Sequence, residues 1–150
     1  MKPLSSKHPS NANSKFVLDE RLISDTYFIT NLSLCSILLM NDARYPWIIA
    51  VPRRNKIKEI YELKSRDQLL LLREINLMAE IIKSKFKSDK INIGAMGNIV
   101  PQLHIHIVGR KENDPAWPAP VWGFGTPLTY EKKNADEIII NLINELQTSP

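Results

Sequence analysis

Short apolar segments separated by turn-forming residues fill the first third of the chain. They are rich in β-branched or aromatic side chains and are interrupted by Asp, Asn and Pro, a pattern that is typical of β-strands. The pattern predicts strands at 16–22, 26–31, 33–40 and 47–52. Two more strands are predicted on the same grounds, at 90–97 and 102–109.

A different periodicity marks two helices. Between 65 and 88, apolar residues recur every three or four positions and lysines gather near the end, as in an amphipathic helix. Ser65 and Gln68 have the spacing of a capping box at the start of this helix. Thr129 is predicted to cap a C-terminal helix, whose apolar face holds Ala135, Ile138, Ile139, Leu142, Ile143 and Leu146.

The order of these elements predicts the α+β class. Strands outnumber helices, and their short connections favour antiparallel pairing. We expect an antiparallel sheet of about five strands, covered by one long helix and accompanied by a C-terminal helix. The proline-rich segment 114–127 is expected to be an irregular loop. Residues 1–15, including His8, are expected to form a disordered tail, which leaves 16–150 as a single domain.

Composition narrows the possible classes of protein. The net charge of +4 is too small to indicate a nucleic-acid partner. The longest apolar run, at 34–40, is too short to cross a bilayer. The single cysteine, Cys35, cannot form an intrachain disulfide and is expected to be a small buried apolar residue. We therefore expect a cytoplasmic protein that binds neither membranes nor nucleic acid.

The sequence PQLHIHIVGR at 101–110 holds two of the three histidines. Successive side chains of a strand point to opposite faces. We therefore expect Gln102, His104 and His106 to share one face of the strand. The other face is expected to join the core through Leu103, Ile105 and Ile107.

This row of polar side chains suits a site that handles an anion. A neutral imidazole can attack phosphorus, and a second one can pass a proton to a departing oxygen. The same residues are also compatible with histidines that contact only water or other side chains. A metal shared by His104 and His106 is not expected, because the sequence offers neither a third ordered histidine nor a cysteine cluster.

The stretch resembles the signature of the histidine-triad (HIT) family of nucleotide hydrolases and transferases, in which three histidines alternate with apolar residues along a strand. The resemblance covers about residues 16–110 and includes LLMND, VPRR, the long helix and GAMGN. The continuation VPQLHIHIVGR, followed by NDPAWPAPVWG, is similar to a bacterial diadenosine tetraphosphate hydrolase-like subgroup. The resemblance implies a HIT-like fold, a nucleotide substrate, a homodimer and no metal or cofactor.

The resemblance also implies roles for the three polar residues. His106, followed by IVGR, matches the third histidine of the triad, and His104 matches the central nucleophile. Gln102 replaces the first histidine, which supports the other two through hydrogen bonds. The nucleophile would need its other ring nitrogen protonated and held by a backbone carbonyl.

The activity implied is hydrolysis or transfer at the α-phosphate of nucleoside phosphate derivatives, such as dinucleoside polyphosphates or phosphoramidates, through a covalent nucleotidyl-histidine. The alternative is a catalytically weak nucleotide-binding module of the same fold, because Gln102 departs from the triad. Three residues are implied to bind the nucleotide: Asp42 at the ribose hydroxyls, Asn98 near the phosphates, and Asn41. Asp42 and Asn98 equally suit turns.

Two further features leave their roles open. The basic segment 52–58 could attract polyphosphate or an oligonucleotide, or it could be a solvated loop. Trp117 and Trp122 could close over a base or a dimer partner, or they could anchor the proline-rich loop to the body of the domain.

Overall fold

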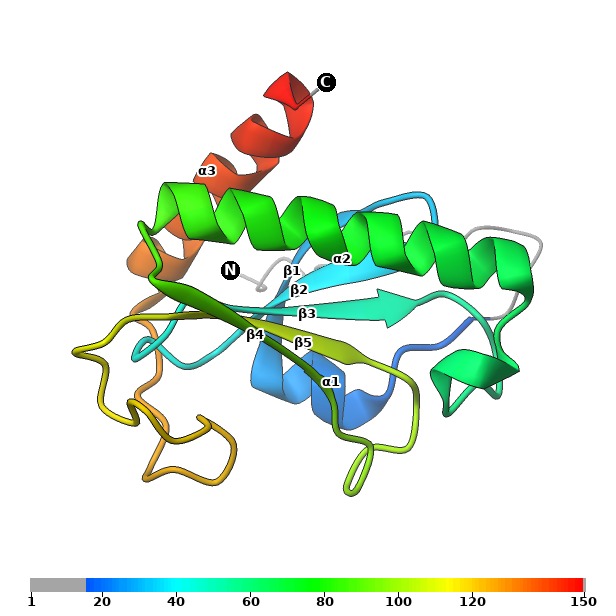
Figure 1. Cartoon of the computed structure of the whole chain (residues 1–150), viewed down its shortest axis with the longest axis horizontal. Helices are drawn as coiled ribbons and strands as arrows, with labels where there is room; N and C mark the ends of the chain where they lie inside the picture. Colours follow the sequence, from blue (N-terminus) through cyan, green and yellow to red (C-terminus); the bar gives the residue numbers. More distant parts are fainter. Residues whose placement is uncertain (1–15, 150) are drawn as a thin grey trace, which may run out of the picture.

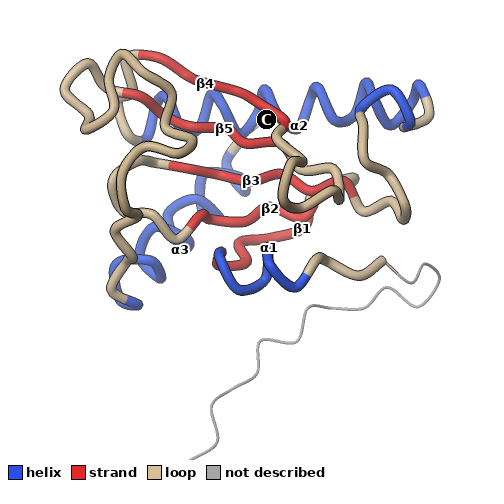
Figure 2. Tube along the Cα trace, turned by 90° about the horizontal axis from the view of Figure 1, so that it is seen from below, coloured by secondary structure: helices blue, strands red, loops and turns tan. Residues whose placement is uncertain are grey.

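The computed structural model describes residues 16–149 and shows one antiparallel sheet with helices on both faces (Figure 1). The sheet has five strands in the order β1-β2-β3-β5-β4, and β1 and β4 form its two edges (Figure 2). This architecture confirms the predicted α+β class. The strands are β1 (Thr26–Asn31), β2 (Cys35–Met40), β3 (Trp47–Pro52), β4 (Lys90–Ala95) and β5 (Ile105–Arg110).

Each face of the sheet has its own apolar core. The long helix α2 (Ser65–Lys85) and the C-terminal helix α3 (Lys132–Thr148) pack on one face. The short helix α1 (Glu20–Asp25) and the proline-rich loop cover part of the other. A one-turn 3₁₀ helix, η1 (Ile60–Glu62), precedes α2. The two layers leave the central strands β3 and β5 buried along their whole length.

Residues 16–22 do not form the predicted strand, and α1 begins within them. The Asp19 carboxylate accepts a hydrogen bond from the backbone N–H of Arg21 and caps the helix. Leu18 and Leu22, four residues apart, are both buried, but a strand and a helix alike place residues at this spacing on one face, so the Asp19 cap is what distinguishes the helix. Glu20 and Arg21, which lie between them, belong to the first helical turn.

Both predicted helix caps are also wrong. Ser65 is the first residue of α2, and the cap position is Lys64, whose side chain makes no capping hydrogen bond. Gln68 instead donates to the carbonyl of Leu63. At α3 the cap position is Glu131, two residues beyond Thr129. The predicted tail at 1–15, with His8, lies outside the described residues.

A buried carboxylate joins α2 to the turn between β1 and β2. Glu74 is only 5% exposed, and its two oxygens accept hydrogen bonds of 2.8 Å from the backbone N–H groups of Leu34 and Cys35. Cys35 is fully buried, as expected; burial, followed by the charge of Glu74, raises the pKa of its thiol well above the usual value. The pair of hydrogen bonds fixes the helix over the sheet, because both donors would otherwise be buried without partners.

Replacing Glu74 by Gln should lower the free energy of unfolding by about 2 kcal/mol, because the amide NH₂ would face a buried backbone N–H that needs an acceptor. Urea unfolding should show a lower midpoint with an unchanged slope. The matched control is Glu80→Gln, an exposed position on the same helix. An equal midpoint for wild type and Glu74→Gln would show that this carboxylate does not hold the layers together.

Candidate active site

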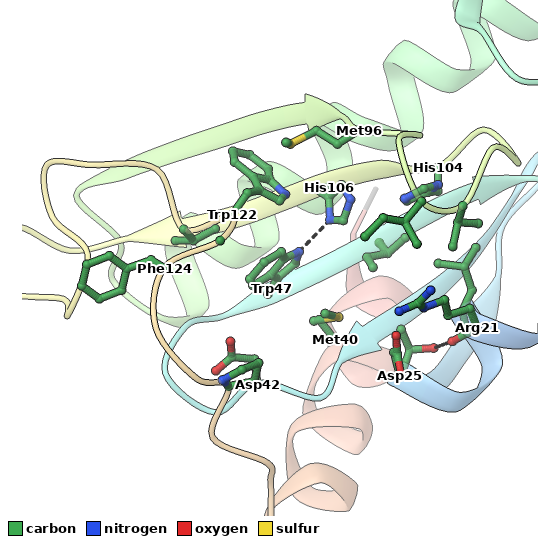
Figure 3. A pocket seen from close by; sticks show the side chains of 18 of the residues that line it. Arg21, Asp25, Met40, Asp42, Trp47, Met96, His104, His106, Trp122 and Phe124 are labelled. Atoms are coloured by element: carbon green, nitrogen blue, oxygen red, sulfur yellow. Dashed lines mark hydrogen bonds between the residues drawn. The ribbon is translucent and has the colours of Figure 1, made fainter.

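The alternation of β5 and the residues before it separates the core from a cavity. Leu103, Ile105 and Ile107 join the core beneath α2. His104 and His106 lie on the other face and line a cavity of about 560 Å³ (Figure 3). The regular strand begins only at Ile105. The apolar wall of the cavity includes Leu22, Met40, Trp47, Ile49, Val100 and Val121.

His104 makes a hydrogen bond that fixes which of its nitrogens carries hydrogen. Its Nδ1 lies 2.7 Å from the backbone carbonyl oxygen of Gln102. A carbonyl oxygen can only accept, so Nδ1 must donate. In the neutral ring the lone pair then sits on Nε2, which is the arrangement that a nucleophilic imidazole requires.

His106 is held in the opposite way. The indole Nε1–H of Trp47 donates to Nδ1 of His106 over 2.9 Å (Figure 3). Because an indole can only donate, Nδ1 must be the acceptor and the hydrogen of the neutral ring sits on Nε2. Burial, followed by the charge of His104, lowers the pKa of His106 to about 4. The ring is therefore neutral near neutral pH.

Aromatic rings hold the plane of His106. Trp47 and Trp122 each contact it edge-on, with ring centroids 5.6 Å away, and His104 does so at 5.0 Å. Trp122 fits here because Gly94, the β4 partner of His106, has no side chain. A Cβ at Gly94 would lie 3.3 Å from the indole of Trp122.

The side chain of Gln102 serves a different element from the histidines it was expected to support. Its amide oxygen accepts from the backbone N–H of Asp19, and its amide nitrogen donates to the carbonyl of Val17, both over 2.9 Å. These two bonds tie the segment before α1 to the approach to β5. Gln102 supports His104 through its backbone carbonyl instead.

The candidate nucleotide-binding residues Asn98 and Asp42 both line the cavity but differ in their exposure and in their partners. Asn98 is exposed and lines the cavity. Asp42 is buried and also lines it, but its carboxylate is paired with the guanidinium of Arg44 through contacts of 2.9 and 2.7 Å. Burial alone would raise the pKa of Asp42, but hydrogen bonds from Arg44 and Leu128 outweigh burial and lower it. The carboxylate therefore stays charged.

The end of β2 also holds the far end of the proline-rich loop. The side-chain oxygen of Asn41 accepts a hydrogen bond from the backbone N–H of Tyr130. Asn41 is not part of the cavity wall. Arg44 donates to the carbonyl of Phe124 over 2.7 Å. Asn41 and Arg44 thus fix the chain that brings Trp122 and Phe124 to the cavity.

The two tryptophans of the loop have separate positions. Trp117 stacks on the guanidinium of Arg110, 5.6 Å from the ring centroid. Arg110 is buried and pairs with Asp114 through contacts of 2.7 and 3.0 Å. Trp117 therefore anchors the loop, and Trp122 faces the site.

Several residues of the cavity were not identified from the sequence. Trp47 lies on β3 two residues before Ile49, the register partner of His106, so only the strand pairing reveals that they meet. Arg21 and Asp25 come from α1, at the opposite end of the cavity from Trp122 and Phe124 (Figure 3). The sequence predicts a strand at 16–22, which includes Arg21, and a connection at Asp25, so it does not indicate that one helix brings both side chains to the cavity.

The basic segment 52–58 lies outside this cavity. Arg54, which belongs to this segment, forms an ion pair with Asp67 of α2. Among residues 16–149, no group of three or more His, Cys, Asp or Glu side chains could hold a metal ion. None of the helices in that range has both the length and the apolar character needed to cross a membrane.

Comparison with known proteins gives the family. The model of the HIT domain matches residues 22–113. A crystal structure of a histidine-triad protein from Sinorhizobium meliloti is 46% identical, covers 87% of this chain and 97% of its own, and superposes with a TM-score of 0.86. A histidine-triad protein from Marinobacter aquaeolei gives 44% identity, coverage of 88% and 96%, and a TM-score of 0.86.

A more distant structure shows the fold alone. Plasmodium falciparum diadenosine triphosphate hydrolase is 22% identical over 93% of this chain and 89% of its own, with a TM-score of 0.58. No curated protein matches the sequence. The family model and the similar bacterial structures together show that this chain belongs to the histidine-triad (HIT) family.

Proposed function

We propose that this protein is a nucleotide hydrolase or transferase that acts at the α-phosphate of nucleoside phosphate derivatives, with His104 as the nucleophile. The observation that carries the proposal is the 2.7 Å contact between Nδ1 of His104 and the Gln102 carbonyl. That contact leaves the Nε2 lone pair for attack, on a ring that lines a cavity large enough for a nucleotide.

The reaction has two steps. Nε2 of His104 attacks the α-phosphorus, the bond from phosphorus to the leaving group breaks, and a nucleotidyl-histidine forms. Water, or another acceptor, then attacks the same phosphorus and releases His104. His106 lies beside the nucleophile and presents its Nε2–H to phosphoryl oxygens, where it stabilises developing negative charge.

The cavity wall suggests how the nucleotide lies. The base packs against the apolar wall formed by Leu22, Met40 and Ile49. Arg21 and Asn98 flank the phosphates with polar groups. Asp42 Oδ2 accepts a hydrogen bond from Arg44, and a carboxylate oxygen can accept more than one, so this oxygen also binds a ribose hydroxyl.

Three finer assignments belong to the same proposal. The substrates are dinucleoside polyphosphates or phosphoramidates, as in the diadenosine tetraphosphate hydrolase-like subgroup that the sequence resembles. The protein is a cytoplasmic homodimer, again on that resemblance. Of the two edge strands, β4 carries the half-exposed Ile93, and we place the second copy at this edge, where it extends the sheet.

Replacing His104 by Ala should abolish adduct formation and lower turnover of a dinucleoside polyphosphate by at least about a thousandfold, because no other group takes over nucleophilic attack. Single-turnover mixing with labelled substrate, followed by mass spectrometry, should show an acid-labile nucleotidyl group on wild type only. His8→Ala is the matched histidine control. Nucleotide binding without adduct or product in wild type would show a binding module instead of an enzyme.

Replacing Gln102 by His should raise KM by about tenfold and leave kcat nearly unchanged. The imidazole cannot reproduce both hydrogen bonds to Val17 and Asp19, so the α1 wall of the cavity loosens, whereas the backbone carbonyl at 102 still holds His104. Steady-state kinetics on one nucleotide substrate measures both constants.

Gln102→Glu, which keeps the acceptor for Asp19 but loses the donor to Val17, should give an intermediate KM. A Gln102→His enzyme with much higher kcat and an unchanged KM would show that Gln102 weakens the catalytic machinery and does not position α1.

A further inference from the structure

His106 is bound to a partner that disfavours its protonated form. An imidazolium carries hydrogen on both ring nitrogens. Protonation would therefore place an Nδ1–H against the Nε1–H of Trp47, which lies 2.9 Å away. Ordinary histidines avoid such a conflict by turning, but this ring is 7% exposed and is contacted by three other rings.

The charged surroundings of His106 do not favour an added proton. In the segment just before its own strand, the facing titratable group is His104. On β4 the partner is Gly94, and on β3 it is Ile49. The charged side chains elsewhere on the cavity wall form two sets, Arg21 with Asp25 on α1, and Asp42 with Arg44 after β2. The Asp42 carboxylate is already paired with Arg44.

Building on the proposed function, we propose that Trp47 is a positioning residue that keeps His106 a neutral Nε2–H donor, so that the site takes phosphoanhydride substrates whose leaving group departs as an anion. His106 then donates a hydrogen bond but does not give up its proton. The low pKa of His106, about 4, agrees with this geometry.

The electron and proton balance follows for an anhydride. The Nε2 lone pair of His104 forms the N–P bond, and the P–O bond breaks with its electron pair staying on the leaving phosphate oxygen. That oxygen is stable as an anion near neutral pH and needs no proton. In the second step water forms the new O–P bond, the N–P electron pair returns to His104, and one water proton goes to solvent.

A phosphoramidate has a different requirement. Its leaving nitrogen must receive a proton as the P–N bond breaks, because an amide anion is far too basic to depart. His106 cannot supply that proton without creating the conflict with Trp47. General acid catalysis contributes about 10²- to 10⁴-fold, so amine leaving groups are disfavoured by a comparable factor.

The first test measures the tautomer and the titration of His106 by ¹⁵N-histidine NMR of the full chain. The signals are assigned through the variants His104→Ala and His106→Ala. Wild-type His106 should show the Nε2–H tautomer and no titration between pH 8 and pH 5. Trp47→Phe removes the N–H but keeps an aromatic ring, so the tautomers should mix and the pKa should rise by about one pH unit.

Trp122→Phe is the matched control, because Trp122 contacts the same ring but its own Nε1 has no hydrogen-bond partner within residues 16–149. The His106 tautomer should be unchanged in this variant. Hydrogen on Nδ1 of wild-type His106, or identical His106 signals in wild type and folded Trp47→Phe, would overturn the role of Trp47.

The second test compares diadenosine tetraphosphate with adenosine 5′-phosphoramidate, which share the adenylyl group and differ in the leaving group. Wild type should show at least about a hundredfold higher kcat/KM for the anhydride. In Trp47→Phe near pH 5.5 the ratio should narrow by about tenfold, because more His106 is protonated.

The outcomes separate the two proposals. Equal or faster turnover of the phosphoramidate by wild type would overturn the leaving-group inference while leaving the proposed function intact. No turnover and no adduct with either compound would overturn the proposed function and the leaving-group inference with it.

Discussion

Two neighbouring histidines are held with their hydrogens on opposite nitrogens, and the chemistry of the site depends on this difference. The partner of His104 is a carbonyl oxygen, which can only accept, and the partner of His106 is an indole N–H, which can only donate. Neither partner can reverse its role when the pH changes. One ring therefore has a lone pair on Nε2, and the other has a hydrogen there.

The fold supplies these partners from different parts of the chain. The Gln102 carbonyl lies on the approach to β5, where the N–H of Leu103 is bonded to the Ile57 carbonyl. Trp47 reaches His106 because β3 and β5 are adjacent in the sheet. The ion pair between Arg110 and Asp114 shapes the loop that brings Trp122 over the same ring. The tautomers thus depend on tertiary structure as well as on the motif.

Sequence reasoning identified the parts of this arrangement that are local. Alternation in the 101–110 segment correctly predicted which face carries His104 and which side chains enter the core, and helical periodicity located α2 and α3. Sequence reasoning could not identify Trp47, because the residues of β3 and β5 do not themselves show that these strands pair. Trp47 and His106 lie 59 residues apart in the sequence. The strand predicted at 16–22 is wrong because the spacing of apolar residues there fits both a short strand and a capped helix, and the chain forms the helix. The motif places Gln102 in one row with the histidines and so predicts that its side chain supports them. The side chain instead bonds to a segment more than 80 residues away in the sequence.

The central proposal is that, of the two histidines within residues 16–149, His104 is the one whose Nε2 lone pair attacks phosphorus. The most direct measurement is ³¹P–¹⁵N coupling in the nucleotidyl intermediate, trapped on protein labelled with ¹⁵N-histidine. A nucleotidyl group on Nε2 of His104 is the predicted result. A phosphorus bonded to Nδ1 of that ring, or to either nitrogen of His106, would contradict the account.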